Sequence, residues 1–226
     1  MRYHRRGLGQ SSRAAGPVTI EDQARDSAAL MRHLGLGSAH VAGHSYGGVI
    51  ALQLALDAPD LVHSLALLEP ALLMVPGAQA FMEQAAPVFA AYERGDKEAA
   101  VEMFIQGVGR PNSREIVENA IPGGFDQAIR DADTFFTIEV PALEAWKFDA
   151  DAARRITQPV LYMLSEDCLP LFAEGRALTH EWLPQTEDLL VRGVCHLLQM
   201  ESAEAVAAGL AAFFEAHPLT VPAPSR

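Results

Sequence analysis

The residues best suited to chemistry in this 226-residue chain include a serine at a glycine-rich turn. Ser45 lies in the run GHSYGG, residues 43–48, which fits the pattern G-x-S-x-G. The apolar run 39–44 that leads into it is typical of a buried strand, and the pattern VIALQLALD that follows is helical. A serine at such a strand-to-helix turn is strained and exposed, as in a nucleophile elbow. The sequence therefore predicts a nucleophilic serine.

The neighbours of Ser45 supply what acyl chemistry needs. We expect Gly43 and Gly47 to be required because the backbone at an elbow closes too tightly for a Cβ atom. The turn aims the backbone N–H of Tyr46 at the point where the serine hydroxyl reacts, and the helix N-terminus adds a positive partial charge there. Both would stabilise an oxyanion.

A serine also needs a base, and position selects one of the chain's eight histidines. His196 follows the last predicted strand, in GVCHLLQM, and precedes the last predicted helix. Loops that follow parallel strands meet at one edge of the sheet, so we expect His196 to face Ser45. The two cysteines, Cys168 and Cys195, are too few for a disulfide framework or a cysteine-rich zinc site, and we expect free thiols. No metal site, phosphate-binding loop or dinucleotide fingerprint is visible, so the sequence predicts no metal and no cofactor.

A parallel sheet would position these residues. The sequence first predicts a helix over 19–33, with Thr19 and Asp22 as its capping box, a strand at 39–44, a helix at 47–57 and a strand at 61–68. Helices alone follow, at about 79–92, 96–106, 113–120, 124–138 and 141–146. The pattern then alternates again, with a strand at 159–164, a helix at 170–182, a strand at 187–192 and a helix at 202–216. Apolar strands that alternate with helices predict the α/β class, with a mostly parallel sheet flanked by helices.

These features together resemble the α/β-hydrolase fold family. The resemblance rests on the elbow, on His196, and on the run HRRGLGQS at 4–11, which is similar to the family's R-G-x-G-x-S loop. It implies a core of residues 1–70 and 157–226 with an inserted all-helical cap, or lid, at 71–156. It also implies an N-terminally shortened fold. The family's first three strands, and the loop that donates its second oxyanion N–H, have no counterpart here, and we expect run 39–44 to be an exposed sheet edge.

The acid of the triad has two candidates. After the strand at 159–164 the family usually has G-x-x-D, but this chain has Ser165-Glu166-Asp167-Cys168, with a cysteine at the acid's position. Asp167 lies one residue early. Glu69 ends the strand after the elbow helix, where some members of the fold place the acid instead. A thiol cannot orient an imidazole as a carboxylate does. Glu69 is preferred, and Asp167 stays open.

Aromatic and other large apolar residues recur along the predicted cap. We expect most of them to pack between the cap helices and a minority to line an apolar pocket that faces Ser45. They are Phe81, Met82, Phe89, Phe104, Phe135, Phe136 and Trp146.

Composition limits the partners. A net charge of −12 disfavours binding to nucleic acid or to anionic membranes, and we expect the arginines at 2, 5, 6 and 13 to be solvated surface. No signal peptide and no membrane span are visible, which predicts a cytoplasmic protein.

The sequence thus predicts a serine hydrolase that cleaves a small, fairly apolar ester or related acyl compound, with no partner beyond this small-molecule substrate. The alternatives are an acyltransferase or perhydrolase with the same triad, or a weak or inactive homologue that acts in binding. Association of identical chains through the exposed sheet edge is a further alternative.

Overall fold

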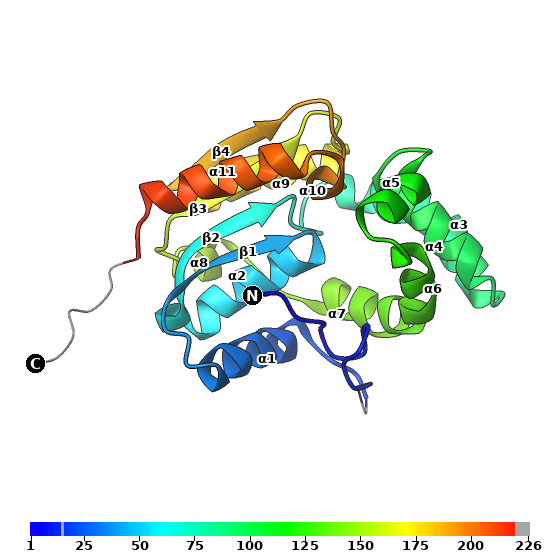
Figure 1. Ribbon diagram of the computed structural model, residues 1–226, viewed down its shortest axis with the longest axis horizontal. Coiled ribbons are helices and arrows are strands. Elements are labelled where there is room, and N and C mark those ends of the chain that lie inside the picture. Colours follow the sequence, from blue (N-terminus) through cyan, green and yellow to red (C-terminus); the bar gives the residue numbers. More distant parts are fainter. Residues whose placement is uncertain (15, 220–226) are drawn as a thin grey trace, which may run out of the picture.

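A computed structural model describes residues 1–14 and 16–219 of the chain (Figure 1). Its four strands form one parallel sheet in the order β1-β2-β3-β4. The strands are β1 Ala39–His44, β2 Val62–Leu68, β3 Val160–Ser165 and β4 Thr186–Val191. Each predicted strand boundary lies within one residue of the observed one. The predicted α/β class with a parallel sheet is confirmed.

Helices cover both faces of this sheet. They are α1 Ile20–His33, α2 Tyr46–Asp57, the short 3₁₀ turn η1 Pro59–Leu61, α8 Ala150–Ala153, α9 Pro170–Trp182, α10 Leu198–Glu201 and α11 Ala203–Ala216. The predicted capping box of α1 is confirmed, because the Thr19 hydroxyl accepts from Asp22 N–H and the Asp22 carboxylate accepts from Thr19 N–H. Among residues 1–14 and 16–219, no helix is both long and apolar enough to cross a membrane.

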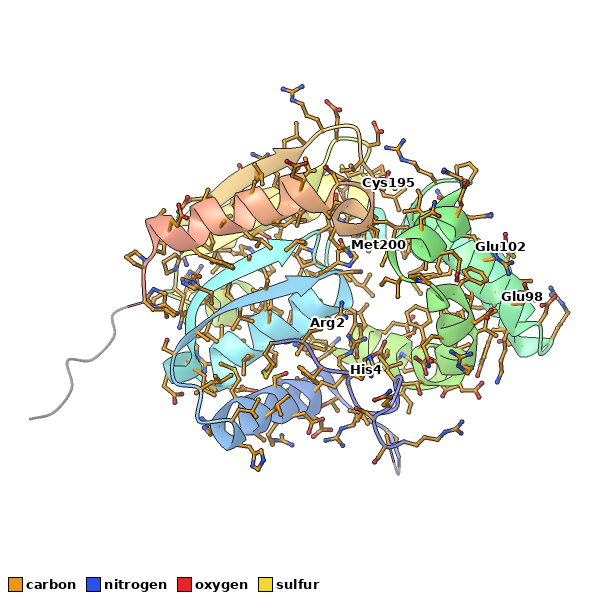
Figure 2. The ribbon with its side chains drawn as sticks, viewed as in Figure 1. Arg2, His4, Glu98, Glu102, Cys195 and Met200 are labelled. Carbon is orange, nitrogen blue, oxygen red and sulfur yellow. The ribbon has the colours of Figure 1, made fainter. Side chains whose placement is uncertain are left out.

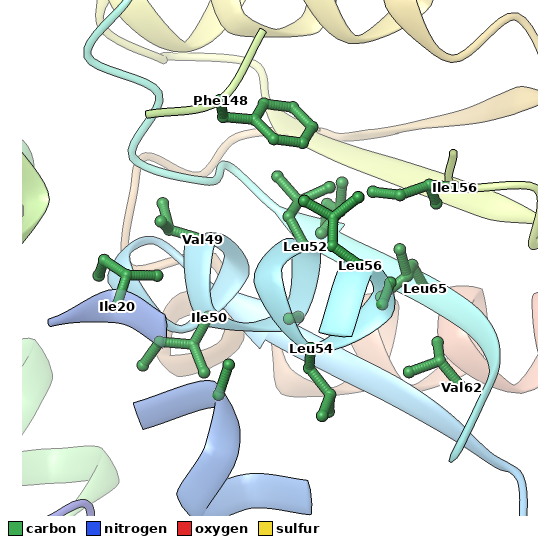
Figure 3. Close-up of a cluster of buried hydrophobic side chains, with 14 of the residues drawn as sticks. Ile20, Val49, Ile50, Leu52, Leu54, Leu56, Val62, Leu65, Phe148 and Ile156 are labelled. Atoms are coloured by element: carbon green, nitrogen blue, oxygen red, sulfur yellow. The ribbon is translucent and has the colours of Figure 1, made fainter. Parts of the chain in front are cut away.

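The alternation of side chains along β2 divides the core into two layers. Leu65 and Leu67 pack with α1 and α2, whereas Ala66 and Leu68 pack toward α11, where Phe213 lies. Helix α2 is buried along most of its length, as expected for a helix held against a parallel sheet. Figure 3 shows its apolar side chains within the cluster that also holds Phe148. The helix that begins at the elbow is therefore fixed from several sides.

In the described part of the chain, the remaining helices lie between β2 and β3, and we call them the helical block. It comprises α3 Gly77–Glu93, α4 Lys97–Val108, α5 Ser113–Ala120, α6 Gly124–Thr134, the π-helical turn η2 Phe135–Glu139 and α7 Val140–Ala145. The block lies beyond the carboxyl ends of the strands (Figure 1). These are the ends from which the loops that carry Ser45 and His196 emerge.

A regular helix over 124–138 is wrong for its last residues. From Phe135 the chain forms a π-helical turn, and Val140 N–H donates to the Phe135 carbonyl, five residues back. Pro141 has no N–H with which to continue an α-helical ladder to the Thr137 carbonyl, so the wider turn relieves this mismatch.

The chain that leaves the block packs into the main core. Trp146 stacks on Phe148, with ring centroids 5.0 Å apart, and its Nε1–H donates to Gln53 Oε1 on α2 at 2.8 Å. Trp146 therefore packs outside the block to which the sequence assigned it, because α2 offers both an apolar face and an amide acceptor.

The N-terminal residues run beside β1. In the part of the chain that the structure describes, β1 has a strand neighbour on one side only. Arg2, labelled in Figure 2, and Tyr3 line a hollow along β1. The expectation that the N-terminal arginines are solvated is wrong for Arg5. Its guanidinium donates to Glu139 at 2.6 and 2.8 Å, and Glu139 is only 3% exposed. A buried carboxylate needs such a partner.

Candidate active site

Ser45 occupies a strained turn between β1 and α2. Its backbone has φ 51° and ψ −118°, a region that residues with a side chain rarely adopt. Its N–H donates to the Leu68 carbonyl of β2 at 2.9 Å, and its own carbonyl accepts from Gly48 and Ala71. Hydrogen bonds from three segments therefore hold the turn in place.

The steric need for glycine differs between the two predicted positions. A Cβ atom on Gly43 would lie 2.3 Å from the Gly47 carbonyl oxygen, so β1 can meet the start of α2 only through glycine. A Cβ atom on Gly47 would meet no atom within 4 Å, so the expected crowding at Gly47 is wrong. Gly48 is crowded instead, because its Cβ would approach the Pro70 side chain to 2.8 Å.

His196 and Glu69 meet at the carboxyl edge of the sheet. His196 Nδ1 lies 2.7 Å from Glu69 Oε2, and the two side chains are 4% and 0% exposed. The other carboxylate oxygen, Oε1, accepts from Ser165 N–H at 2.7 Å and from the Ser165 hydroxyl at 2.5 Å. Because a carboxylate accepts, Nδ1 of His196 carries the proton in this contact and Nε2 of the neutral ring can accept one.

Two aromatic rings fix the plane of the His196 imidazole. The Phe172 ring is stacked on it with centroids 4.2 Å apart, and the His44 ring lies 4.5 Å away. His44 Nε2–H donates to the His196 carbonyl at 2.8 Å, and Gln199 donates to His44 Nδ1. Burial lowers the pKa of His44 to about 3, so this ring is neutral and acts as a fixed donor.

Ser45 and His196 open into one cavity of about 70 Å³. Apart from Ser45, Tyr46 and His196, the cavity is lined by apolar side chains from the core and the helical block, which are Ala71, Leu73, Phe81, Met82, Ala85, Phe89, Phe104, Val108, Phe135, Val140, Leu143, Leu171 and Phe172. As the first residue of α2, Tyr46 has a backbone N–H without an intrahelical acceptor. A reacting group in this cavity would meet a hydroxyl, an imidazole and an amide donor against apolar walls.

Comparison with known proteins identifies this fold. Residues 2–104 match the family model described as the alpha/beta hydrolase fold. The fold is shared with the malate-bound structure of a thermophilic esterase from Thermogutta terrifontis, at a TM-score of 0.77 and 21% identity over 95% of this chain and 79% of that one. The chain has the α/β-hydrolase fold.

Other known proteins resemble the chain over parts of their own length. A protein of Azorhizobium caulinodans, provisionally named carbamate hydrolase RutD, is 48% identical over 63 residues, which are 28% of this chain and 24% of that protein. A dihydrolipoyllysine-residue acetyltransferase component of an acetoin cleaving system, from Pseudomonas putida, is 25% identical over 217 residues, which are 93% of this chain and 55% of that protein. The aligned segments thus span about a quarter and about half of the lengths of these two relatives.

In this α/β-hydrolase, the second candidate acid lies apart from His196. The Asp167 side chain is 58% exposed and pairs with Arg110 of the helical block at 2.8 Å. Arg110 also donates to the Gly193 carbonyl at 2.8 Å and lies 3.0 Å from Glu201. Asp167 thus belongs to a link between the block and the loop that carries His196.

The cysteines are both free thiols. Cys195 is buried beside α10 (Figure 2), and its Sγ donates to Glu201 at 2.7 Å. Burial raises the pKa of the Cys195 and Cys168 thiols, which leaves them protonated. Within residues 1–14 and 16–219, no group of three or more His, Cys, Asp or Glu side chains is placed to hold a metal ion.

Sequence reasoning gave no role to three residues of this α/β-hydrolase site, namely Ser165, His44 and Phe172. The signal for Ser165 was present, because it is the serine that replaces the family's glycine after the third predicted strand. His44 lay within the elbow motif as its variable position. Phe172 had no local signal, since its contact with His196 spans 24 positions and depends on how α9 packs.

Proposed function

We propose that this α/β-hydrolase is a serine hydrolase that cleaves a small, uncharged, fairly apolar ester or related acyl compound. Ser45 is the nucleophile, His196 the general base and acid, and Glu69 the residue that orients His196. The observation that best supports this proposal is the 2.7 Å contact between His196 Nδ1 and Glu69 Oε2. His196 lines the same cavity as Ser45. Nucleophile, base and orienting acid are the three roles that acyl transfer to a serine needs.

The proposed reaction has two halves. The Ser45 hydroxyl attacks the carbonyl carbon while His196 Nε2 takes its proton, and the tetrahedral oxyanion accepts from Tyr46 N–H. His196 returns the proton to the leaving alcohol, and the acyl group stays on Ser45. Water, deprotonated by His196, then attacks the acyl carbonyl carbon. The bond to Ser45 Oγ breaks, the acid leaves, and His196 returns the proton to Ser45 Oγ. Throughout, Glu69 accepts from Nδ1–H and stabilises the imidazolium that forms.

The walls of the cavity support an uncharged substrate. Burying an unpaired charge against apolar side chains is costly, whereas an alkyl or aryl group gains free energy from the transfer. We propose that residues 71–156 act as the cap over the core formed by 1–70 and 157–226. In this role the helical block supplies the apolar wall opposite Ser45, and the core supplies the polar groups.

Labelling with a fluorophosphonate tests the nucleophile. We expect wild-type protein to be labelled once and to hydrolyse p-nitrophenyl butyrate, and Ser45→Ala to lose both properties. The matched control is Ser38→Ala, because Ser38 is exposed and lies outside the cavity. Labelling that persists in Ser45→Ala would contradict the proposal.

A second candidate is acyl transfer by the same residues. The apolar walls favour it, since they would bind an organic acceptor more readily than water. Product analysis with a primary alcohol or hydrogen peroxide present distinguishes the two reactions. An acyl ester or peracid as the main product favours transfer, and free acid favours hydrolysis. A folded protein that neither reacts with the probe nor releases nitrophenol would instead favour a binding role, in which the exposed edge of β1 is the candidate contact between copies.

A further inference from the structure

We propose that Phe104 and Phe135 form a partition that limits the length of the acyl chain, and that a second apolar chamber lies behind it. The inference rests on the proposed acyl chemistry at Ser45 and deepens it, because it names the residues that select the substrate. It assigns the second chamber to the distal methylenes of a longer acyl chain once the partition is removed.

Two cavities meet at these rings. The first, about 70 Å³, holds Ser45 and His196. The second, about 280 Å³, is lined by the helical block, including Val101 of α4, and by Leu8 of the N-terminal segment. Phe104 and Phe135 line both cavities, so a wall one side chain thick separates them.

The two rings close the wall by touching each other. Their centroids are 4.7 Å apart at an interplanar angle of 55°, and they come from different elements, α4 and η2. Both side chains are half-buried, whereas the adjacent Phe136 is 7% exposed and stacks on Tyr92 with centroids 4.5 Å apart. The partition rings therefore border open space on their faces, while Phe136 is fixed by packing.

The π-helical turn sets this arrangement. Phe135 is its first residue, and the ring of Phe136 lies at 82° to that of Phe135. The extra residue in the turn lets consecutive aromatic side chains serve different purposes, one as partition and one as core. Such turns are often found at functional sites.

The chemistry of the second chamber fits an alkyl chain. Its two carboxylates already have partners, because Glu139 accepts from Arg5 and Asp131 accepts from Gly9 N–H. The remaining lining is apolar apart from the backbone. A methylene moved from water into such surroundings gains about fourfold in binding, so each carbon admitted past the wall should be visible in kcat/KM.

A series of p-nitrophenyl esters from acetate to dodecanoate tests the partition. We expect wild-type kcat/KM to fall steeply beyond short chains. In Phe104→Ala and in Phe135→Ala, the ratio of kcat/KM for decanoate to that for butyrate should rise by about tenfold or more, as a few buried methylenes would give. Refilling the chamber by Ala128→Phe, which lines only the second cavity, should abolish that gain in the Phe104→Ala background.

The matched control is Met103→Ala, which removes an exposed side chain next to Phe104 and lines neither cavity. Thermal unfolding of each variant establishes that it folds, and Phe104→Leu replaces Phe104→Ala if the latter does not. An unchanged ratio in folded Phe104 and Phe135 variants overturns the partition.

A binding measurement separates this inference from the proposed chemistry. In a Ser45→Ala background, calorimetric titration with 1-decanol should show about tenfold tighter binding when Phe104→Ala is added, while 1-butanol binding stays the same. Equal gains for both alcohols overturn the inference. Tighter decanol binding in a protein without esterase activity would support the chamber and count against the proposed function alone.

Discussion

Glu69 and Asp167 are both carboxylates at the carboxyl ends of neighbouring strands, yet their surroundings are opposite. Glu69 is fully buried and uses both oxygens, one for His196 and one for Ser165. Asp167 is 58% exposed and pairs with Arg110. The first carboxylate lies in a buried hydrogen-bond network, and the second in an ion pair at the surface. A buried network whose hydrogen bonds are all satisfied stabilises the fold and tolerates few substitutions, whereas an exposed ion pair contributes little to stability.

Neutralising each carboxylate in turn is the most direct test of the difference between Glu69 and Asp167. Glu69→Gln should lower kcat by about 10³- to 10⁴-fold, because an amide no longer fixes the tautomer or stabilises the imidazolium of His196. Asp167→Asn should change kcat by less than about threefold, since exposed pairs are weak. Steady-state kinetics with p-nitrophenyl butyrate measures both. The reverse order of effects would make Asp167 the acid.

Part of the fold and of the candidate site could be predicted from the sequence. The strands and long helices are local patterns, so their periodicity predicted them to within a few residues, whereas α8 and α10, four residues each, left no periodic signal. The choice between Glu69 and Asp167 is not local. Glu69 leaves β2 with φ 43°, and its N–H donates to Met163 of β3, which turns the side chain inward. Secondary-structure propensities do not predict such a turn.

Pairings distant in sequence were likewise out of reach. Arg5 and Glu139 are 134 positions apart, and their contact joins the N-terminal segment to the helical block. The same holds for the wall between the two cavities, since Phe104 and Phe135 looked like other aromatic residues of the block. The sequence predicted that a minority of the seven large apolar residues face Ser45. This is wrong, because five of them line the cavity, namely Phe81, Met82, Phe89, Phe104 and Phe135.

His44 tests the interior network through its titration. Its folded-state pKa, about 3, lies below the unfolded value near 6.5, so the unfolded chain binds a proton that the folded chain refuses as the pH falls. The stability that this group contributes is complete above pH 6.5 and is lost on acidification toward pH 3. Between pH 6.5 and 5, we expect a loss of up to about 2 kcal/mol.

Urea unfolding at several pH values measures that slope. In His44→Gln the slope between pH 6.5 and 5 should become shallower, because the titrating ring is gone. His33→Gln is the control, since His33 is exposed at the end of α1. Parallel slopes in wild type and His44→Gln would show that His44 is solvated and titrates freely.

Substitution of Ser165 tests how the Glu69 carboxylate is held in place. Ser165→Ala removes the hydroxyl donor to Glu69 Oε1 and leaves the backbone N–H donor at 2.7 Å. A hydrogen bond to a buried carboxylate contributes about 1.5 kcal/mol, so we expect kcat to fall by about tenfold. In the Glu69→Gln background the same change should have little further effect, because it acts through Glu69. A full tenfold loss in that background would place Ser165 in the reaction independently.

Substitution of Arg110 should give the smallest effect, because Arg110 pairs with the exposed carboxylate of Asp167. Arg110→Ala removes the contacts to Asp167 and Glu201 that join the helical block to the loop of His196. We expect a loss of about 1 kcal/mol of stability that shrinks at high salt, with kcat within about threefold of wild type. Arg114→Ala is the matched control, since its ion pairs to Glu98 and Glu102 lie within the block (Figure 2). If only Arg110→Ala raises KM, the surface link holds the block over the site. A loss of kcat as large as that of Ser165→Ala would mean that the exposed link orients His196, and the contrast between the two carboxylates would no longer hold.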